Sequence, residues 1–120
     1  MSITLPVSLV ETSDLAFVYV TFPTLELARE IGRAAVEKQL CACVNIMAEH
    51  DSIYRWQGNI ESSSEIGAVF KTSQSHLQEL ADLVLKLHPY DTPCFAVLSP
   101  EKMNSEFASW IRTEITRSRR

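Results

Sequence analysis

His88 has the best-defined setting for metal chemistry of any side chain in this sequence. Pro89 follows it and holds the histidine in extended backbone, so the ring has a fixed direction at the end of an apolar helical pattern. Asp91 lies three positions further on and can orient the imidazole, as carboxylates do for metal-binding histidines. The alternative is a cap on the helix C-terminus, where a cation is favourable. The residues support the two interpretations about equally.

Two thiols, Cys41 and Cys43, form the second candidate for metal binding. On a strand they would share one face with Asn45 and Met47, and two thiolates with a thioether suit Cu(I). We prefer the simpler interpretation of small side chains packed under a helix, because the spacing is not that of a zinc site. The total of three cysteines is odd, which excludes a complete set of intrachain disulfides and favours a reducing cytoplasm.

The other two histidines have weaker settings. Glu49, His50 and Asp51 bring three ligand types together, but adjacent residues rarely converge on one ion. We therefore expect a solvated loop over residues 48–51. His76 lies in the first turn of a predicted helix and is expected to face water.

A pair of aromatic residues and one lysine suggest contacts beyond a simple core. Tyr54 and Trp56 are two positions apart and share one side of a strand, just before a turn at Gly58. That strand is long for a small domain and needs another edge to pair with, so we expect pairing between subunits. Lys71 lies among apolar residues of a central strand and requires a carboxylate or an anionic ligand.

Composition and missing motifs exclude several classes of protein. The sequence contains no G-x-x-x-x-G-K-[ST], G-x-G-x-x-G or G-x-S-x-G pattern, so we expect neither an enzyme nor an organic cofactor. A net charge of −4 over 120 residues argues against nucleic acid or an anionic membrane as partner. The longest apolar run, residues 15–20, is too short to span a bilayer, and the N-terminus lacks a signal-peptide pattern.

The elements that must position these residues follow the order β-α-β-β-α-β-α. Apolar and β-branched runs predict four strands over 15–22, 40–47, 60–73 and 94–99, with a further extended piece over 52–56. Helical spacing predicts helices over 24–39, 75–87 and 104–115. Two β-α-β units in one sheet form a ferredoxin-like α+β sandwich, here with an additional C-terminal helix. Right-handed crossovers then place the first and third strands centrally.

Local signals refine these boundaries. Thr24 is a predicted N-cap, and Ser75-x-x-Gln78 has the form of a capping box. The inner stripe of the last helix is expected to contain Ile111, Ile115 and either Trp110 or Ala108, together with Phe107. We expect residues 1–14 to be an N-terminal extension of uncertain order and residues 15–120 to be one domain.

Several short motifs, taken together and in order, are characteristic of a family. They are Cys43–Ile46, Tyr54–Gly58, Lys71–Thr72, His88–Tyr90, Pro93 and Trp110. In order and spacing they resemble the CutA divalent-cation tolerance proteins from about Phe17 to Arg112. The resemblance implies a ferredoxin-like subunit in a tight homotrimer shaped like the PII signalling proteins. It also implies a link to copper and divalent-metal tolerance and no agreed enzymatic activity.

The resemblance also implies candidate site residues. The bacterial family's copper positions, a cysteine ending the first strand and two histidines before the proline, correspond here to Val20, Leu87 and His88. Cys43 matches the family pattern. The predicted metal residues are therefore His88 and Cys43, with Cu(II) or another divalent cation bound weakly.

A cleft between subunits is the second site that we predict. Its expected ligand residues are Trp56, Lys71, Tyr90 and Asp91. The first hypothesis is a non-catalytic homotrimer that binds divalent metal there and contributes to metal tolerance. The alternative is a PII-like signalling module that holds a small anion near Lys71.

Overall fold

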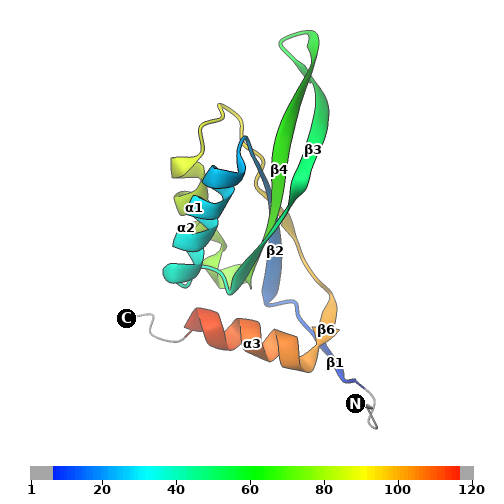
Figure 1. The fold of residues 1–120 in the computed structure, drawn as a ribbon. Coiled ribbons are helices and arrows are strands. Elements are labelled where there is room, and N and C mark those ends of the chain that lie inside the picture. Colours follow the sequence, from blue (N-terminus) through cyan, green and yellow to red (C-terminus); the bar gives the residue numbers. More distant parts are fainter. Residues whose placement is uncertain (1–6, 117–120) are drawn as a thin grey trace.

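The computed structural model describes residues 7–116. Its main sheet has four strands, and helices pack on one face of that sheet (Figure 1). The sheet has the order β3-β4-β2-β5 and is antiparallel throughout. The strands and helices are β1 (Leu9–Glu11), β2 (Leu15–Phe22), α1 (Leu25–Glu37), β3 (Cys43–Trp56), β4 (Asn59–Ser73), α2 (Leu77–Leu87), β5 (Ala96–Leu98), β6 (Lys102–Asn104) and α3 (Ser105–Thr116). The central strands are the predicted ones, so the ferredoxin-like architecture is confirmed.

The main core lies between the sheet and helices α1 and α2. Phe22 and Phe70 point from β2 and β4 toward these helices, and Ile31 of α1 packs against them; all three are fully buried. Thr24 caps α1 as predicted, because its Oγ1 accepts a hydrogen bond from the Leu27 backbone N–H at 3.1 Å. The alternation of β2 therefore sends one set of side chains to the helices and leaves the other set on the opposite face.

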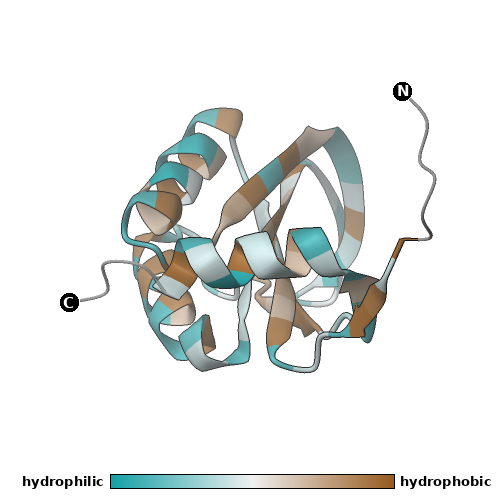
Figure 2. Ribbon diagram, turned by 90° about the horizontal axis from the view of Figure 1, so that it is seen from below, coloured by the Kyte–Doolittle hydropathy of each residue, from teal (hydrophilic) through white to brown (hydrophobic). Residues whose placement is uncertain are grey.

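Helix α3 covers only one end of that opposite face, and Figure 2 shows it lying across the molecule seen from below. Its buried residues are Ala108, Ile111 and Ile115. Trp110 is 41% exposed and stacks on Phe107, so of the two alternatives for the inner stripe Ala108 is correct. α3 does not cover the other end of the same face, where side chains of the β3–β4 hairpin line a pocket.

Part of the predicted N-terminal extension is a strand. β1 pairs antiparallel with β6, with Val10 opposite Met103. Thr12 is fully buried and donates from its hydroxyl to the Pro100 carbonyl oxygen at 2.6 Å. The short polar sequence around this strand gave no periodic signal, because its partner lies about ninety positions away; residues 1–6 are outside the described part of the chain.

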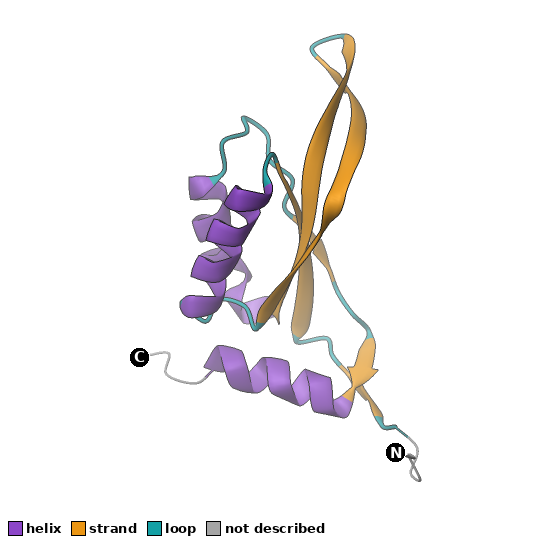
Figure 3. Cartoon of the chain, in the orientation of Figure 1, coloured by secondary structure: helices purple, strands orange, loops and turns teal. Residues whose placement is uncertain are grey.

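The β3–β4 hairpin projects beyond the helices as an arm, which is clear in Figure 3. The predicted loop over residues 48–51 is wrong, because β3 runs without a break through it. The pairing of β3 with β4 shifts register between Ile46 and Glu49, which is a β-bulge. Residues 49–51 are polar because both faces of the arm are exposed to solvent, and not because the chain turns there. At its tip Gln57 (φ 50°) and Gly58 (φ 84°) form a two-residue turn at the place where the turn at Gly58 was predicted, and Asn59 already belongs to β4.

The start of α2 also differs from the prediction. Ser75 is hydrogen-bonded to Ser73, with 3.0 Å between their hydroxyl oxygens, and the Gln78 amide donates to Asp82, so no capping box forms. A single 3₁₀ turn precedes the helix instead. His76 does not face water: it is 8% exposed, and its Nδ1 lies 2.6 Å from the Ser73 hydroxyl oxygen.

Candidate functional site

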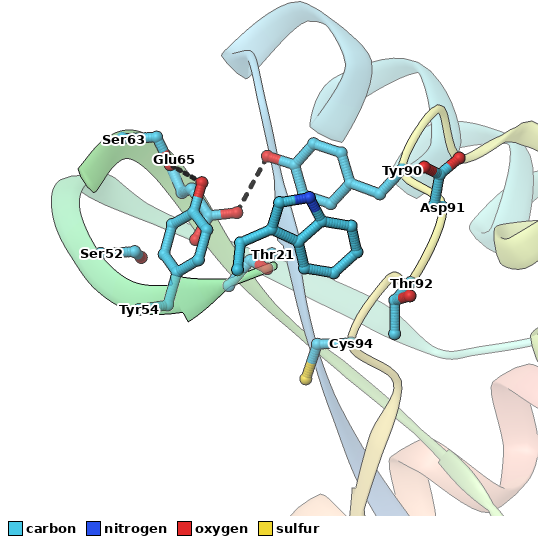
Figure 4. Close-up of a pocket in the computed structure, with 10 residues that line it drawn as sticks. Thr21, Ser52, Tyr54, Ser63, Glu65, Tyr90, Asp91, Thr92 and Cys94 are labelled. Atoms are coloured by element: carbon cyan, nitrogen blue, oxygen red, sulfur yellow. Dashed lines mark hydrogen bonds between the residues drawn. The ribbon is translucent and has the colours of Figure 1, made fainter. Parts of the chain in front are cut away.

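A pocket of about 490 Å³ lies where the arm leaves the sheet, and Figure 4 shows the side chains around it. It is lined by β3 residues Ser52, Tyr54 and Trp56, by Ser63 and Glu65 of β4, by Thr21, and by Tyr90, Asp91, Thr92 and Cys94 of the segment after α2. The β3 residues alternate along the strand and so share one face. Cross-strand pairing of Ser52 with Ser63 puts the β4 residues on that same face.

Glu65 is the most highly hydrogen-bonded group in this pocket. The Tyr90 hydroxyl donates to its Oε2 at 2.9 Å. Burial raises the pKa of Glu65, but hydrogen bonds from Ser52, Tyr90 and Thr21 and the nearby charge of His50 outweigh it and leave the pKa below its usual value. The carboxylate is therefore ionised at neutral pH.

The pKa of Tyr90 is shifted in the opposite direction, upward. Burial, the hydrogen bond to Glu65 and the charges of Glu65 and Tyr54 raise its pKa to about 12. The phenol stays protonated at neutral pH and remains a donor to the carboxylate.

His88 is held inside the protein by both ring nitrogens. It is 8% exposed, its Nε2 donates to the Thr21 carbonyl oxygen at 2.7 Å, and its Nδ1 accepts from the Tyr90 backbone N–H at 3.3 Å. A carbonyl oxygen can only accept, so the hydrogen is on Nε2 and the ring is neutral. The ring also stacks on Phe22, with 5.2 Å between centroids. Thr21 and Tyr90 thus orient this ring, in place of the predicted Asp91.

The cysteines do not form the predicted shared face. Cys41 precedes β3 and lies in the helix-side core, where burial and the nearby Cys43 raise its pKa to about 12. The Cys43 side chain points to the other face, because Val44 is the residue that meets Gly32 of α1. Burial raises the Cys43 pKa and the charge of Lys71 opposes this rise. Cys94 is exposed at the pocket.

Lys71 lies away from the pocket residues with which it was grouped. Its ammonium is 5.3 Å from the ring centroid of Phe17 and 5.1 Å from that of Phe107. Two aromatic faces therefore replace the carboxylate or anion that the sequence led us to expect. The structure brings Trp56, Tyr90 and Asp91 to one pocket and leaves Lys71 beneath α3.

Glu65 is the charged residue of the pocket that the sequence analysis missed. A signal for it was present in the hairpin turn, because Trp56 pairs with Asn59 across the two-residue loop. Counting back from that pair puts Glu65 opposite His50, on the same face as Trp56. Because a loop was predicted over residues 48–51, the strand pairing was not followed as far as His50 and Glu65.

A single chain does not supply a metal centre within residues 7–116. No group of three or more His, Cys, Asp or Glu side chains in this range lies close enough together to hold an ion. Within the same range, no helix has the length and apolar character needed to cross a membrane.

Comparisons with known proteins agree with this architecture. Residues 16–114 match the family described as CutA1 divalent ion tolerance protein. The divalent-cation tolerance protein CutA of Thermococcus kodakarensis is 42% identical over 98 residues, which are 82% of this chain and 93% of that protein. The solved structure of CutA from Synechococcus elongatus PCC7942 is 37% identical with a TM-score of 0.86, covering 91% of this chain and 96% of that one.

A second solved structure extends the comparison. It is described as the periplasmic divalent cation tolerance protein CutA from Archaeoglobus fulgidus. It is 37% identical with a TM-score of 0.82, over 84% of this chain and 98% of that one.

Proposed function

Because the chain belongs to the CutA1 divalent ion tolerance family, we propose that it is a non-catalytic homotrimer that binds divalent metal, copper included, weakly and takes part in the response to metal ions. Proteins of this family are named for tolerance and not for a reaction. The observation that carries the proposal is the charge of the pocket. Its described lining includes two carboxylates, Glu65 and Asp91, and no Lys or Arg, so it favours cations.

The exposed side chains of the arm support the homotrimer. Ile53 is 76% exposed and Ile60 is 64% exposed, and Tyr54 and Trp56 are each 42% exposed. Apolar residues gathered on a projecting hairpin favour a partner surface, and an unpaired strand edge favours another strand. Three copies with paired arms would satisfy both.

The proposed metal ligands are His88 and Cys43. His88 stacks on Phe22 on the helix side of the sheet and Cys43 points to the other face, so one chain does not bring them together and each would bind metal weakly. His88 would have to give up its hydrogen bond to Thr21 or to Tyr90 to free a nitrogen. Burial raises the Cys43 pKa and so disfavours the thiolate that a metal requires. With no described cluster of three donors in one chain, the remaining ligands would come from another subunit.

Copper titration tests this proposal. Isothermal titration of Cu(II) into the wild type should give weak binding, and His88→Gln and Cys43→Ser should each reduce it. Gln can still donate to the Thr21 carbonyl oxygen, so this variant separates ligation from folding. His76→Gln, which removes a histidine as buried as His88 but outside the pocket, is the matched control. If His88→Gln and the wild type bind copper identically, His88 is not a ligand.

The alternative is a PII-like module that binds a small anion in the cleft between subunits. Lys71 was its main support, and in the structure this ammonium lies over Phe17 and Phe107, outside the pocket. The acidic lining further disfavours an anion. A thermal-shift screen with nucleotides and phosphate should raise the unfolding temperature only if this alternative is correct.

We also propose a cytoplasmic location, on the basis of the odd cysteine count. The Archaeoglobus fulgidus relative is described as periplasmic, so the compartment needs its own test. Fractionation of cells that make the chain at its natural level, followed by detection in each fraction, would decide between the two.

A further inference from the structure

The pocket beneath the arm combines aromatic faces with carboxylates. Tyr54, Trp56 and Tyr90 supply three rings from β3 and from the segment after α2, and Glu65 and Asp91 supply two acidic groups. Figure 4 shows Tyr54 and Tyr90 on either side of Glu65. An aromatic face attracts a cation through its quadrupole, and this attraction is strongest when the cation has a weakly held hydration shell.

The carboxylates of the pocket form no ion pair with a lysine or arginine of the described residues, and one of them is oriented by a hydrogen bond. The Glu65 carboxylate accepts a hydrogen bond from the Tyr90 hydroxyl at 2.9 Å, and this bond orients it. The ion pairs found among residues 7–116 join Lys102 to Glu11 and Arg112 to Asp14, and neither involves Glu65 or Asp91. A cation entering the pocket would therefore meet carboxylates that no lysine or arginine of the described chain compensates.

The space suits an organic molecule better than a bare metal ion. A volume of about 490 Å³ is in the usual range for small-molecule sites. Within one chain, Tyr54 and Trp56 each keep 42% of their surface exposed, so contacts of that chain leave part of each ring available to a ligand. A metal ion needs several converging donor atoms, and no described group of three donors is present to provide them.

We propose that this pocket binds a small organic ammonium ion, with the cationic head against Tyr54, Trp56 and Tyr90 and its charge balanced by Glu65 and Asp91. The serine and threonine hydroxyls of the pocket can bind polar groups carried by the same ligand. This proposal shares with the proposed metal function the acidic charge of the pocket, but it uses neither of the proposed metal ligands, His88 and Cys43, so the two can fail separately.

Choline and its uncharged isostere 3,3-dimethylbutan-1-ol provide the direct test. Both are titrated calorimetrically into the full chain with EDTA present, so that no metal contributes. The two molecules have nearly the same shape, and only choline carries a charge. We expect choline to bind about tenfold or more tightly than the alcohol, as cation–π attraction and a carboxylate would give. Equal binding of the two, or no choline binding at millimolar concentrations, would overturn the proposal.

Variants locate the site. Glu65→Gln removes the charge but keeps an acceptor for Tyr90, and Trp56→Leu removes a ring but keeps apolar volume; each should weaken choline about tenfold. Asp82→Asn is the matched control, because it removes a carboxylate on α2 outside the pocket and should leave binding unchanged. In a Trp110→Phe background, where Trp56 is the single tryptophan, choline should change the fluorescence. If all these variants bind choline like the wild type, the pocket is not the site.

Discussion

The two ends of the β3–β4 hairpin differ in what covers them. At the base, α1 and α2 cover one face of the sheet, α3 covers part of the other, and Phe70 is fully buried. In the arm the same two strands have no helix on either face, and Ile53 is 76% exposed. Helices of the same chain pack against the base and stabilise it, whereas the arm has exposed surface that a ligand or another subunit can contact. The following predictions test this division.

The largest effect is expected in the base. Phe70→Ala leaves a cavity in a closely packed core and should lower the free energy of unfolding by about 3–5 kcal/mol. Ile53→Ala on the arm should change protomer stability by less than about 0.5 kcal/mol but, if subunits meet there, should weaken the assembly and so reduce the dependence of unfolding on protein concentration. Urea denaturation at several concentrations measures both. An equal loss for the two variants would contradict the division.

Thiol reactivity should separate the same two regions. Cys94 is exposed at the pocket, whereas Cys41 is 1% exposed in the core and burial raises its pKa to about 12. We expect Cys94 to react with Ellman's reagent first, Cys43 more slowly, and Cys41 only on unfolding. Cys94→Ser should remove the fast phase. Simultaneous reaction of all thiols in the native protein would show that the base is open to solvent.

Alkaline titration should detect the contact between arm and domain. The pKa of Tyr90 is raised to about 12, above its unfolded value of 10, so its contribution to stability is fully present below pH 10 and is lost as pH rises through about 12. Absorbance at 295 nm should show one tyrosine that ionises late, and Tyr90→Phe should remove it. A late phase that survives Tyr90→Phe would assign the raised pKa to another tyrosine.

The smallest effect concerns a local signal in the base. Thr24 caps α1 through its hydroxyl, and Thr24→Ala should destabilise the protein by about 1 kcal/mol. Thr24→Ser keeps the cap and should restore most of this stability. Thermal unfolding followed by circular dichroism compares the three proteins. If Ser and Ala variants unfold alike, the hydrogen bond contributes little.

Local chemistry made the base predictable from sequence. The cap at Thr24, the buried alternation of β2 and the proline after His88 act within a few residues, so their elements were predicted closely. The arm was read less well, because its polar residues resemble a loop when one strand is considered alone. The pairing of His50 with Glu65 becomes visible only across the hairpin.

The site depended on distant partners that no local pattern contains. The His88 ring is fixed by a carbonyl 67 positions away, and this contact uses one of the two nitrogens with which the ring could bind a metal. Lys71 is satisfied by Phe107 on α3, which the sequence had placed in the core stripe of that helix. Trp56, Tyr90 and Asp91 line one pocket, and the strand register places Glu65 beside them.

The mass of the native protein tests most directly whether the arm is completed by other copies. Sedimentation equilibrium should give three times the chain mass of 13.5 kDa at micromolar concentration, and Ile53→Ser with Ile60→Ser should shift the distribution toward the single chain. A wild-type mass of 13.5 kDa at every concentration would contradict the account, because the exposed surface of the arm would then have no partner subunit.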